Sequence, residues 1–315
     1  MSIIKTLSEI PRYEYVNGIK TGFITHDYND NGLKPGCLTI VTGKTGSGKT
    51  TYVRQILISC GLQQIPCYMF MGETSLEKEK DKLARLIAPK EEIVSFYGVG
   101  GSKLYKASER ANSIFTEQFE PFFYLSDCKS LKEQKDNTSR FVKIYNGMKK
   151  LASEKGVKLF ILDNLMMLCE KNSNALFTEQ KNIIIALKSF TEETKSHVIL
   201  VAHPKKGEGH QDISGATEIM NECDSIVRYI RISEEEQEKL ISRHRDKEYF
   251  LKRISAKLEV NKIRDDGKNI IMWLEWCPEK GALYDISELP EAQKYEDQGL
   301  WTKALNKNNQ KDIYY

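Results

Sequence analysis

A glycine-rich segment at residues 43–50 has the residue types and spacing that hold a triphosphate. Its pattern is Gly-x-x-x-x-Gly-Lys-Thr, and its residues are Gly43, Lys44, Thr45, Gly46, Ser47, Gly48, Lys49 and Thr50. Glycines let backbone N–H groups approach phosphate oxygens without a Cβ in the way, and a following helix points its positive end at the same anion. Lys49 supplies a charge for the β- and γ-phosphates, and Thr50 offers a hydroxyl to Mg²⁺. The segment, continued by Thr51, predicts binding and hydrolysis of ATP, or of another NTP or dNTP, with Mg²⁺.

Two carboxylates follow apolar runs further along the chain. Asp163 ends the run 158–163, and an acid at the carboxyl end of a parallel strand lies where open α/β sheets bind ligands. It can hold Mg²⁺, usually through water, although Asp is also a common helix N-cap. Glu73 follows the run 66–71, where its carboxylate could polarise the attacking water. On spacing alone, a solvated acid at the start of the next helix explains Glu73 equally well.

A histidine and a basic loop follow the run 197–203. His203 closes that run on the same predicted sheet edge and could contact the γ-phosphate, but a lone histidine is more often structural. The loop at 204–211 contains Lys205, Lys206 and His210. Such a loop could follow a phosphodiester backbone. An ordinary solvated loop is an equal alternative.

Three further cations have spacings of interest. Arg231 ends a predicted strand, and Lys262 and Arg264 lie two residues apart on one face of a predicted hairpin. A cation delivered to the triphosphate of a neighbouring subunit would stabilise the charge that develops in phosphoryl transfer. The alternative is ordinary surface charge, which is common in a chain with 47 lysines and arginines.

Apolar runs and amphipathic stretches alternate along the chain and would position these groups. Strands are expected at residues 37–42, 66–71, 121–125, 158–163, 197–203 and 223–232, and helices at 51–61, 75–87, 106–119, 139–155, 178–195 and 233–257. Gly61 is expected to cap the first helix, and glycines near residue 100 mark a loop. The alternation predicts an α/β fold with a mainly parallel sheet flanked by helices. The Asp-Gly at 266–267, between the runs 258–264 and 269–276, predicts a C-terminal β-hairpin.

The composition of the 315 residues, with 40% hydrophobic and 29% charged, is that of an ordinary globular protein. No run approaches the roughly 18 apolar residues that span a bilayer, and the N-terminus has no apolar signal region. We therefore expect a cytoplasmic protein with no membrane partner. The seven cysteines are scattered without a Cys-x-x-Cys pair, so we expect small buried thiols rather than a zinc site. The net charge of +3 is too small to choose between partners.

The order of these features resembles the RecA-like ATPases. Within them it is most similar to the hexameric replicative DNA helicases of superfamily 4, which include DnaB, the phage primase–helicases and mitochondrial Twinkle. The segments that carry the resemblance are residues 20–27, 32–36, 69–75, 160–165 and 212–227. The resemblance covers residues 18–285 and implies a RecA-like P-loop NTPase core. We expect an N-terminal extension at 1–17, the ATPase/helicase domain at 18–286 and a polar tail at 287–315.

The resemblance implies an ATP-dependent motor that translocates on single-stranded DNA, in the 5′ to 3′ direction, and unwinds forked duplex. It implies a hexameric ring of identical subunits and a primase as a further partner. It assigns catalytic roles to Glu73, Lys49 and His203, and DNA contacts to the 205–211 loop. Arg231 falls where phage and Twinkle-type members place an arginine finger. Lys262-Ile263-Arg264 matches the K-x-R hairpin that other members direct at the adjacent triphosphate.

Other functions remain open at this point. A RecA/RadA-like recombinase or a KaiC-like ATPase shares the fold without unwinding DNA, and an ATP-switched assembly or loader protein would use the site only as a switch. The K-x-R hairpin and the 212–227 segment favour the helicase over the recombinase. The sequence lacks a zinc-binding or primase-like region and a DnaB-type N-terminal domain. It is therefore either the motor part of a longer protein or a stand-alone helicase.

Overall fold

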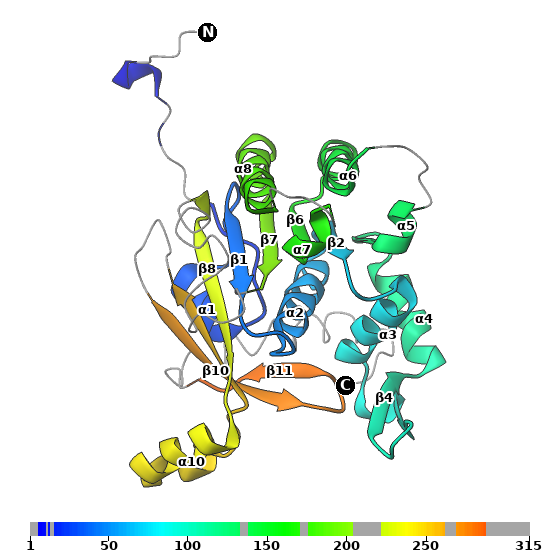
Figure 1. Ribbon diagram of the computed structural model, residues 1–315, viewed down its shortest axis with the longest axis vertical. Coiled ribbons are helices and arrows are strands. Elements are labelled where there is room, and N and C mark those ends of the chain that lie inside the picture. The colour runs from blue at the N-terminus through cyan, green and yellow to red at the C-terminus, as the bar shows by residue number, and fades with distance from the viewer. Residues whose placement is uncertain are drawn as a thin grey trace.

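The computed structural model describes residues 6–10, 12, 16–132, 138–170, 176–203, 222–261 and 269–287 (Figure 1). Several predicted groups lie outside these residues, namely Lys205, Lys206, His210, Lys262 and Arg264. The turn of the predicted C-terminal hairpin and nearly all of the predicted tail lie outside them as well.

A nine-stranded sheet positions the functional groups, in the order β11-β10-β9-β8-β1-β7-β6-β2-β5. Its parallel strands are β1 (Leu38–Thr42), β2 (Cys67–Met71), β5 (Phe123–Asp127), β6 (Leu159–Asp163), β7 (His197–Ala202) and β8 (Ser225–Arg231). The antiparallel strands are β9 (Ala256–Asn261), β10 (Ile270–Cys277) and β11 (Ala282–Asp285). The predicted α/β fold with a C-terminal antiparallel pair is confirmed.

Helices cover both faces of the sheet, whereas α10 (Glu234–Arg243) has no buried residue. The other described α-helices are α1 (Ile24–Asp30), α2 (Lys49–Leu62), α3 (Leu76–Ile87), α4 (Glu109–Phe119), α5 (Cys128–Lys132), α6 (Arg140–Glu154), α7 (Leu165–Leu168), α8 (Leu176–Thr194) and α11 (Glu248–Leu251). Successive strand residues point to opposite faces, so Val41 joins the core under α2 whereas Ile40 joins the core under α6 and α8. Figure 1 shows α6 and α8 across the strands from α2. No helix in the described part of the chain is long and apolar enough to cross a membrane.

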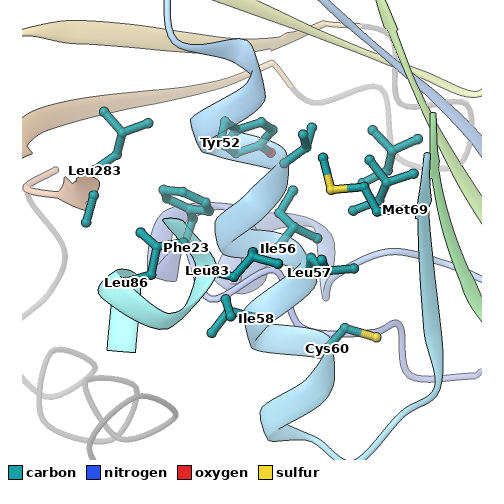
Figure 2. Packing of buried hydrophobic residues seen from close by; sticks show 14 of the residues in the cluster. Phe23, Tyr52, Ile56, Leu57, Ile58, Cys60, Met69, Leu83, Leu86 and Leu283 are labelled. Atoms are coloured by element: carbon teal, nitrogen blue, oxygen red, sulfur yellow. The ribbon is translucent and has the colours of Figure 1, made fainter. Parts of the chain in front are cut away.

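Helix α2 lies in the centre of the hydrophobic core that contains Val41. Its residues Tyr52, Ile56 and Leu57 are almost completely buried, and Figure 2 shows them with Phe23 on one side and Met69 on the other. Because α2 begins at the glycine-rich loop, this packing anchors the loop to the sheet. The helix is fixed by burial on nearly all sides rather than along one stripe.

The predicted role of Gly61 as a helix cap is wrong. Gly61 lies inside α2, which ends at Leu62 and is followed by Gln63 as the C-cap. A Cβ at position 61 would lie 2.3 Å from a ring carbon of Phe123 and 2.7 Å from one of Phe119. The glycine therefore allows two aromatic rings to approach the helix closely, which sequence spacing did not reveal.

The predicted helix at 233–257 is also wrong in its length. It divides into α10 and α11, and β9 begins at Ala256. The amide nitrogen of Gln237, which carries two hydrogens, lies within hydrogen-bond distance of three carbonyl oxygens, of Leu251, Lys252 and Ile254. These bonds hold the chain folded back on α10, so one continuous helix is not formed.

The segment before α4 contains a hairpin that the sequence did not predict. Strands β3 (Ile93–Tyr97) and β4 (Lys103–Ala107) pair antiparallel as a separate two-stranded sheet. The expected helix at 106–119 therefore starts late, at Glu109, where the Ser108 side chain accepts a hydrogen bond from the Ala111 N–H. Helix α1 and strand β11 were not expected either, and β5 begins two residues later than predicted. None of the seven cysteines forms a disulfide, and only Cys60, Cys67, Cys169 and Cys223 are fully buried.

Candidate nucleotide-binding site

The glycine-rich loop joins the buried strand β1 to α2, as predicted. Its glycines at 43, 46 and 48 have φ angles of +151°, +73° and +123°, which side chains with a Cβ rarely adopt. A Cβ on Gly43 would lie 2.3 Å from the carbonyl oxygen of Tyr229, and one on Gly48 would lie 2.7 Å from its hydroxyl oxygen. The loop is therefore held against β8 on one side while its residues 45–50 line a cavity on the other.

That cavity has a volume of about 310 Å³ and gathers the predicted groups of four strands. Lys49, Thr50, Glu73, Asp163 and His203 all line it. The loop after β1 and the residues that end or follow β2, β6 and β7 meet there, because the carboxyl ends of parallel strands lie at one edge of a sheet. The structure therefore brings these five side chains to one cavity, and their catalytic and ligand-binding roles stay predictions.

Lys49 is the buried cation of the cavity, with 4% of its surface exposed. Its Nζ donates to the carbonyl oxygens of Gly43, at 2.7 Å, and Lys44, at 2.8 Å. Burial lowers the pKa of Lys49 to about 8, although the charges of Asp163 and Glu73 oppose this shift. A buried ammonium is costly unless an anion compensates its charge. A phosphate in the cavity would supply that partner.

Asp163 and Thr50, the two predicted Mg²⁺ ligands, are in contact. Burial raises the pKa of Asp163, and a hydrogen bond from the Thr50 hydroxyl opposes that rise. A hydroxyl and a carboxylate are oxygen donors of the kind that Mg²⁺ takes beside phosphate oxygens. The pair therefore fits a magnesium ion that completes its shell with phosphate and water.

Asn164 connects the two remaining predicted groups, and sequence reasoning did not assign it a role. Its Nδ2 donates to Oε1 of Glu73 at 2.7 Å and lies 3.1 Å from Nε2 of His203. The Glu73 and His203 atoms themselves are 4.0 Å apart. The signal that could have found Asn164 is its place directly after Asp163, at the end of β6.

Several polar atoms of the cavity wall lack a partner. Among the described residues, Oγ of Ser47, Oδ1 of Asn164 and Nδ1 of His203 are buried without a hydrogen bond. Burial, and secondarily the charge of Lys49, lower the pKa of His203, so its ring is neutral near pH 7. Buried polar atoms normally have partners. Three orphaned atoms on one cavity wall therefore indicate a polar ligand.

Two more cations border the cavity that the sequence did not indicate. Arg54 of α2 forms a bidentate ion pair with the fully buried Glu79 of α3, with Nη2 at 2.8 Å from Oε2. Lys82 follows on the same helix, and burial and the charge of Arg54 lower its pKa. Both line the cavity, so Arg54 of α2 and Lys82 of α3 add two cations to its wall.

Arg231 stands apart from this group. It is an exposed residue at the end of β8, two positions beyond the Tyr229 that touches the glycine-rich loop. It is not among the residues that line the cavity. A role for Arg231 at a neighbouring subunit's site stays a prediction.

Comparison with known sequences identifies the family. The chain matches the DnaB-like helicase C-terminal domain over residues 18–272. It belongs to this family. Its sequence is 23% identical over 190 residues to the replicative DNA helicase DnaB of Mycoplasma genitalium. That match covers 59% of this chain and 39% of the relative, so the chain corresponds to about two fifths of that protein's length.

Solved structures show the same fold. A DnaB-like replicative helicase, described with its interactions with primase, has a TM-score of 0.64 at 16% identity, over 86% of this chain and 62% of that one. A structure described as an ATPase domain has a TM-score of 0.63 at 15% identity, over 86% and 92%. A KaiC-like protein of Pyrococcus horikoshii has a TM-score of 0.55 at 14% identity, over 84% and 98%. The fold is therefore shared with a protein that is described as KaiC-like rather than as a helicase. The sequence match, and not the fold, assigns this chain to the DnaB-like family.

Proposed function

We propose that this chain is the motor of a replicative DNA helicase, which hydrolyses ATP to move along single-stranded DNA and separate a duplex. The observation that carries the proposal is the convergence of Lys49, Asp163, Glu73 and His203 on one cavity beside the glycine-rich loop. Membership of the DnaB-like family supports the helicase rather than a KaiC-like regulator or a loader. The proposed motor corresponds to residues 18–286.

The residues of the cavity have distinct roles in this proposal. Backbone N–H groups of the loop and Lys49 bind the triphosphate, and Thr50 with Asp163 holds Mg²⁺, which neutralises phosphate charge when bound. Glu73 accepts a proton from a water whose oxygen attacks the γ-phosphorus. The bond from that phosphorus to the β,γ-bridging oxygen breaks, and ADP leaves with its electron pair. His203 contacts the γ-phosphate as a neutral ring.

The partners follow from the family and from residues beyond the cavity. Lys205, Lys206 and His210 contact single-stranded DNA, and Arg231, Lys262 and Arg264 provide cations for a neighbouring subunit's triphosphate. These roles require a ring of identical subunits, which we propose to be a hexamer that moves 5′ to 3′ and works with a primase. Such a protein would act in the cytoplasm or in an organelle that replicates DNA.

Unwinding of a forked duplex, measured with ATP and Mg²⁺ alongside the mass of the protein with and without nucleotide, tests the proposal. We expect ATP-dependent strand separation by an oligomer, and none by the Lys49→Ala variant. ATPase that single strands stimulate without unwinding would instead indicate a recombinase.

A mixing experiment tests the shared site separately. Arg231→Ala is expected to lower the ATPase of the assembled protein by about 10³-fold, the low end of what an arginine finger contributes. Mixing it with Lys49→Ala should restore part of the activity, because some interfaces then pair an intact loop with an intact arginine. A mixture no more active than its components would show that Arg231 acts in no neighbouring site.

A further inference from the structure

The side-chain amide of Asn164 contacts both Glu73 and His203. In the proposed mechanism Glu73 acts on the attacking water and His203 contacts the γ-phosphate. The two contacts use the same nitrogen, at 2.7 Å from Glu73 and 3.1 Å from His203. An amide nitrogen carries two hydrogens, so one atom can donate to both partners. Glu73 and His203 come from the ends of different strands, and Asn164 is the side chain that joins them.

The donors and acceptors of this group allow one arrangement of protons. An ionised carboxylate only accepts, so the amide must present its nitrogen to Glu73. The ring atom Nε2 of His203 must then accept the second hydrogen, which places the ring proton on Nδ1. That atom is buried and has no partner in the described part of the chain. A neutral imidazole with its N–H group left for a ligand is therefore the form that Asn164 stabilises.

The three residues differ sharply in how firmly the fold holds them. The Glu73 side chain is 68% exposed and that of His203 is 25% exposed, whereas Asn164 is 2% exposed. The backbone N–H of Gly72 donates to the carbonyl of Asp163 at 2.6 Å, which brings the residues that follow each of them together. A rigid, buried amide thus holds an exposed carboxylate that would otherwise move freely in solvent.

We propose that Asn164 is a positioning residue that holds Glu73 and His203 in one arrangement and makes the position of each depend on the other. This inference rests on the proposed roles of Glu73 and His203. The residue after His203 begins the loop proposed to contact DNA, so DNA binding would displace His203. Because Asn164 contacts both side chains, that displacement changes how Asn164 holds Glu73. The turnover of ATP and its stimulation by single-stranded DNA therefore both depend on this amide.

The test compares Asn164→Leu, which keeps the size and removes both donors, with the full-length wild type. Removing the hydrogen-bond partner that orients a metal-ligating residue typically costs about 10- to 100-fold, and by analogy we expect kcat for ATP at saturating Mg²⁺ to fall by about 10-fold or more. KM for ATP and the affinity for ADP should change by less than about threefold, because the loop and Lys49 hold the phosphates. The ratio of ATPase with and without single-stranded oligonucleotide should fall towards one.

Asn164→Asp provides a second variant with nearly the original shape, in case the leucine does not fold. An ionised aspartate cannot donate to Glu73, so it should lose at least as much kcat and the same stimulation. Asn112→Leu is the matched control, because Asn112 on α4 also donates its amide, to the Ser108 carbonyl at 3.1 Å, but does not line the cavity. It should keep both kcat and the stimulation ratio.

A double-mutant cycle decides between positioning and a general structural effect. If Asn164 acts through His203, the loss of stimulation in His203→Ala with Asn164→Leu should be smaller than the product of the two single losses. Losses that simply multiply in the double variant would overturn the inference. So would a parallel fall in kcat, ADP affinity and melting temperature in the Asn164 variants. So would an unchanged kcat and stimulation ratio in both Asn164 variants. A wild type without ATPase or without stimulation by DNA would instead overturn the proposed function itself.

Discussion

Strands β1, β2, β6 and β7 are buried along their whole length, whereas β9 alternates buried and partly exposed residues. These four parallel strands are covered on both faces, and the buried charges Lys49 and Asp163 lie where strands end and line the same cavity. In the antiparallel half the charges lie on the sheet surface and pair with one another, as Lys257 does with Glu259 on β9 at 2.5 Å. Buried charges around one cavity mark the functional half, and partly exposed ion pairs on the sheet surface mark the structural half.

The largest effect is expected from removing the buried cation of the parallel half. Lys49→Ala should reduce ATP hydrolysis by about 10³-fold or more, since the loop loses the charge that contacts the phosphates through the reaction. Steady-state release of phosphate, with folding checked by circular dichroism, measures this. Turnover near the wild-type rate would show that the cavity is not the ATPase site.

Glu73→Gln should come next in size. The glutamine keeps the shape but cannot take the proton of the attacking water, so kcat should fall by about 10²-fold or more. ATP binding should persist, because Glu73 is an exposed residue apart from the phosphate-binding loop. Equilibrium binding and single-turnover hydrolysis separate the two steps. Near-normal hydrolysis would leave Glu73 as a solvated acid before α3.

A pH titration tests the buried charge of Lys49 directly. Its pKa of about 8 in the free protein lies below the ordinary 10.5, and a bound phosphate would raise it. Affinity for ADP with Mg²⁺ should then be constant below pH 8 and fall by up to about tenfold per unit above it, as the free protein loses that proton. The same pKa difference affects stability, because the unfolded chain keeps the Lys49 proton up to about pH 10.5. Burial of the charged Lys49 therefore lowers the free energy of unfolding fully below pH 8, and this cost disappears as the pH rises towards 10.5.

The control for this titration is Lys49→Arg, because a guanidinium stays charged throughout that range. Its affinity for ADP can be lower at every pH, but it should not decline above pH 8. Calorimetry in two buffers of different ionisation enthalpy would report the proton taken up. The same decline in both proteins would assign the titration to another group.

The smallest effect is expected in the antiparallel half. Arg253→Ala removes the ion pair with Glu275, in which Nη2 lies 2.6 Å from Oε2, but the arginine side chain is 40% exposed. Solvent-exposed pairs of this kind contribute about 1 kcal/mol or less. The free energy of unfolding, measured with urea, should therefore fall by no more than that amount, and the ATPase rate should stay at the wild-type value. A loss of ATPase would mean that the two halves are not functionally separate.

The prediction from sequence succeeded where neighbouring residues determine the structure. The glycine-rich loop is contiguous, and the runs that form β1, β2, β6 and β7 are mainly apolar, so each could be identified locally. It failed at Gly61, whose purpose is the close approach of Phe119 and Phe123 from elsewhere in the chain. It also failed at the long predicted helix, which Gln237 shortens through contacts 14 to 17 residues away.

The sequence by itself determined that the chain holds a phosphate loop at the carboxyl edge of a mainly parallel sheet, because glycine spacing and apolar runs are local properties. Only the tertiary structure decided which side chains meet there. Asn164 reaches Glu73 across 91 positions of sequence and His203 across 39, and no local pattern encodes that contact. Strand order brings β6 between β7 and β2, and this order places one buried amide between the two groups proposed to carry the chemistry.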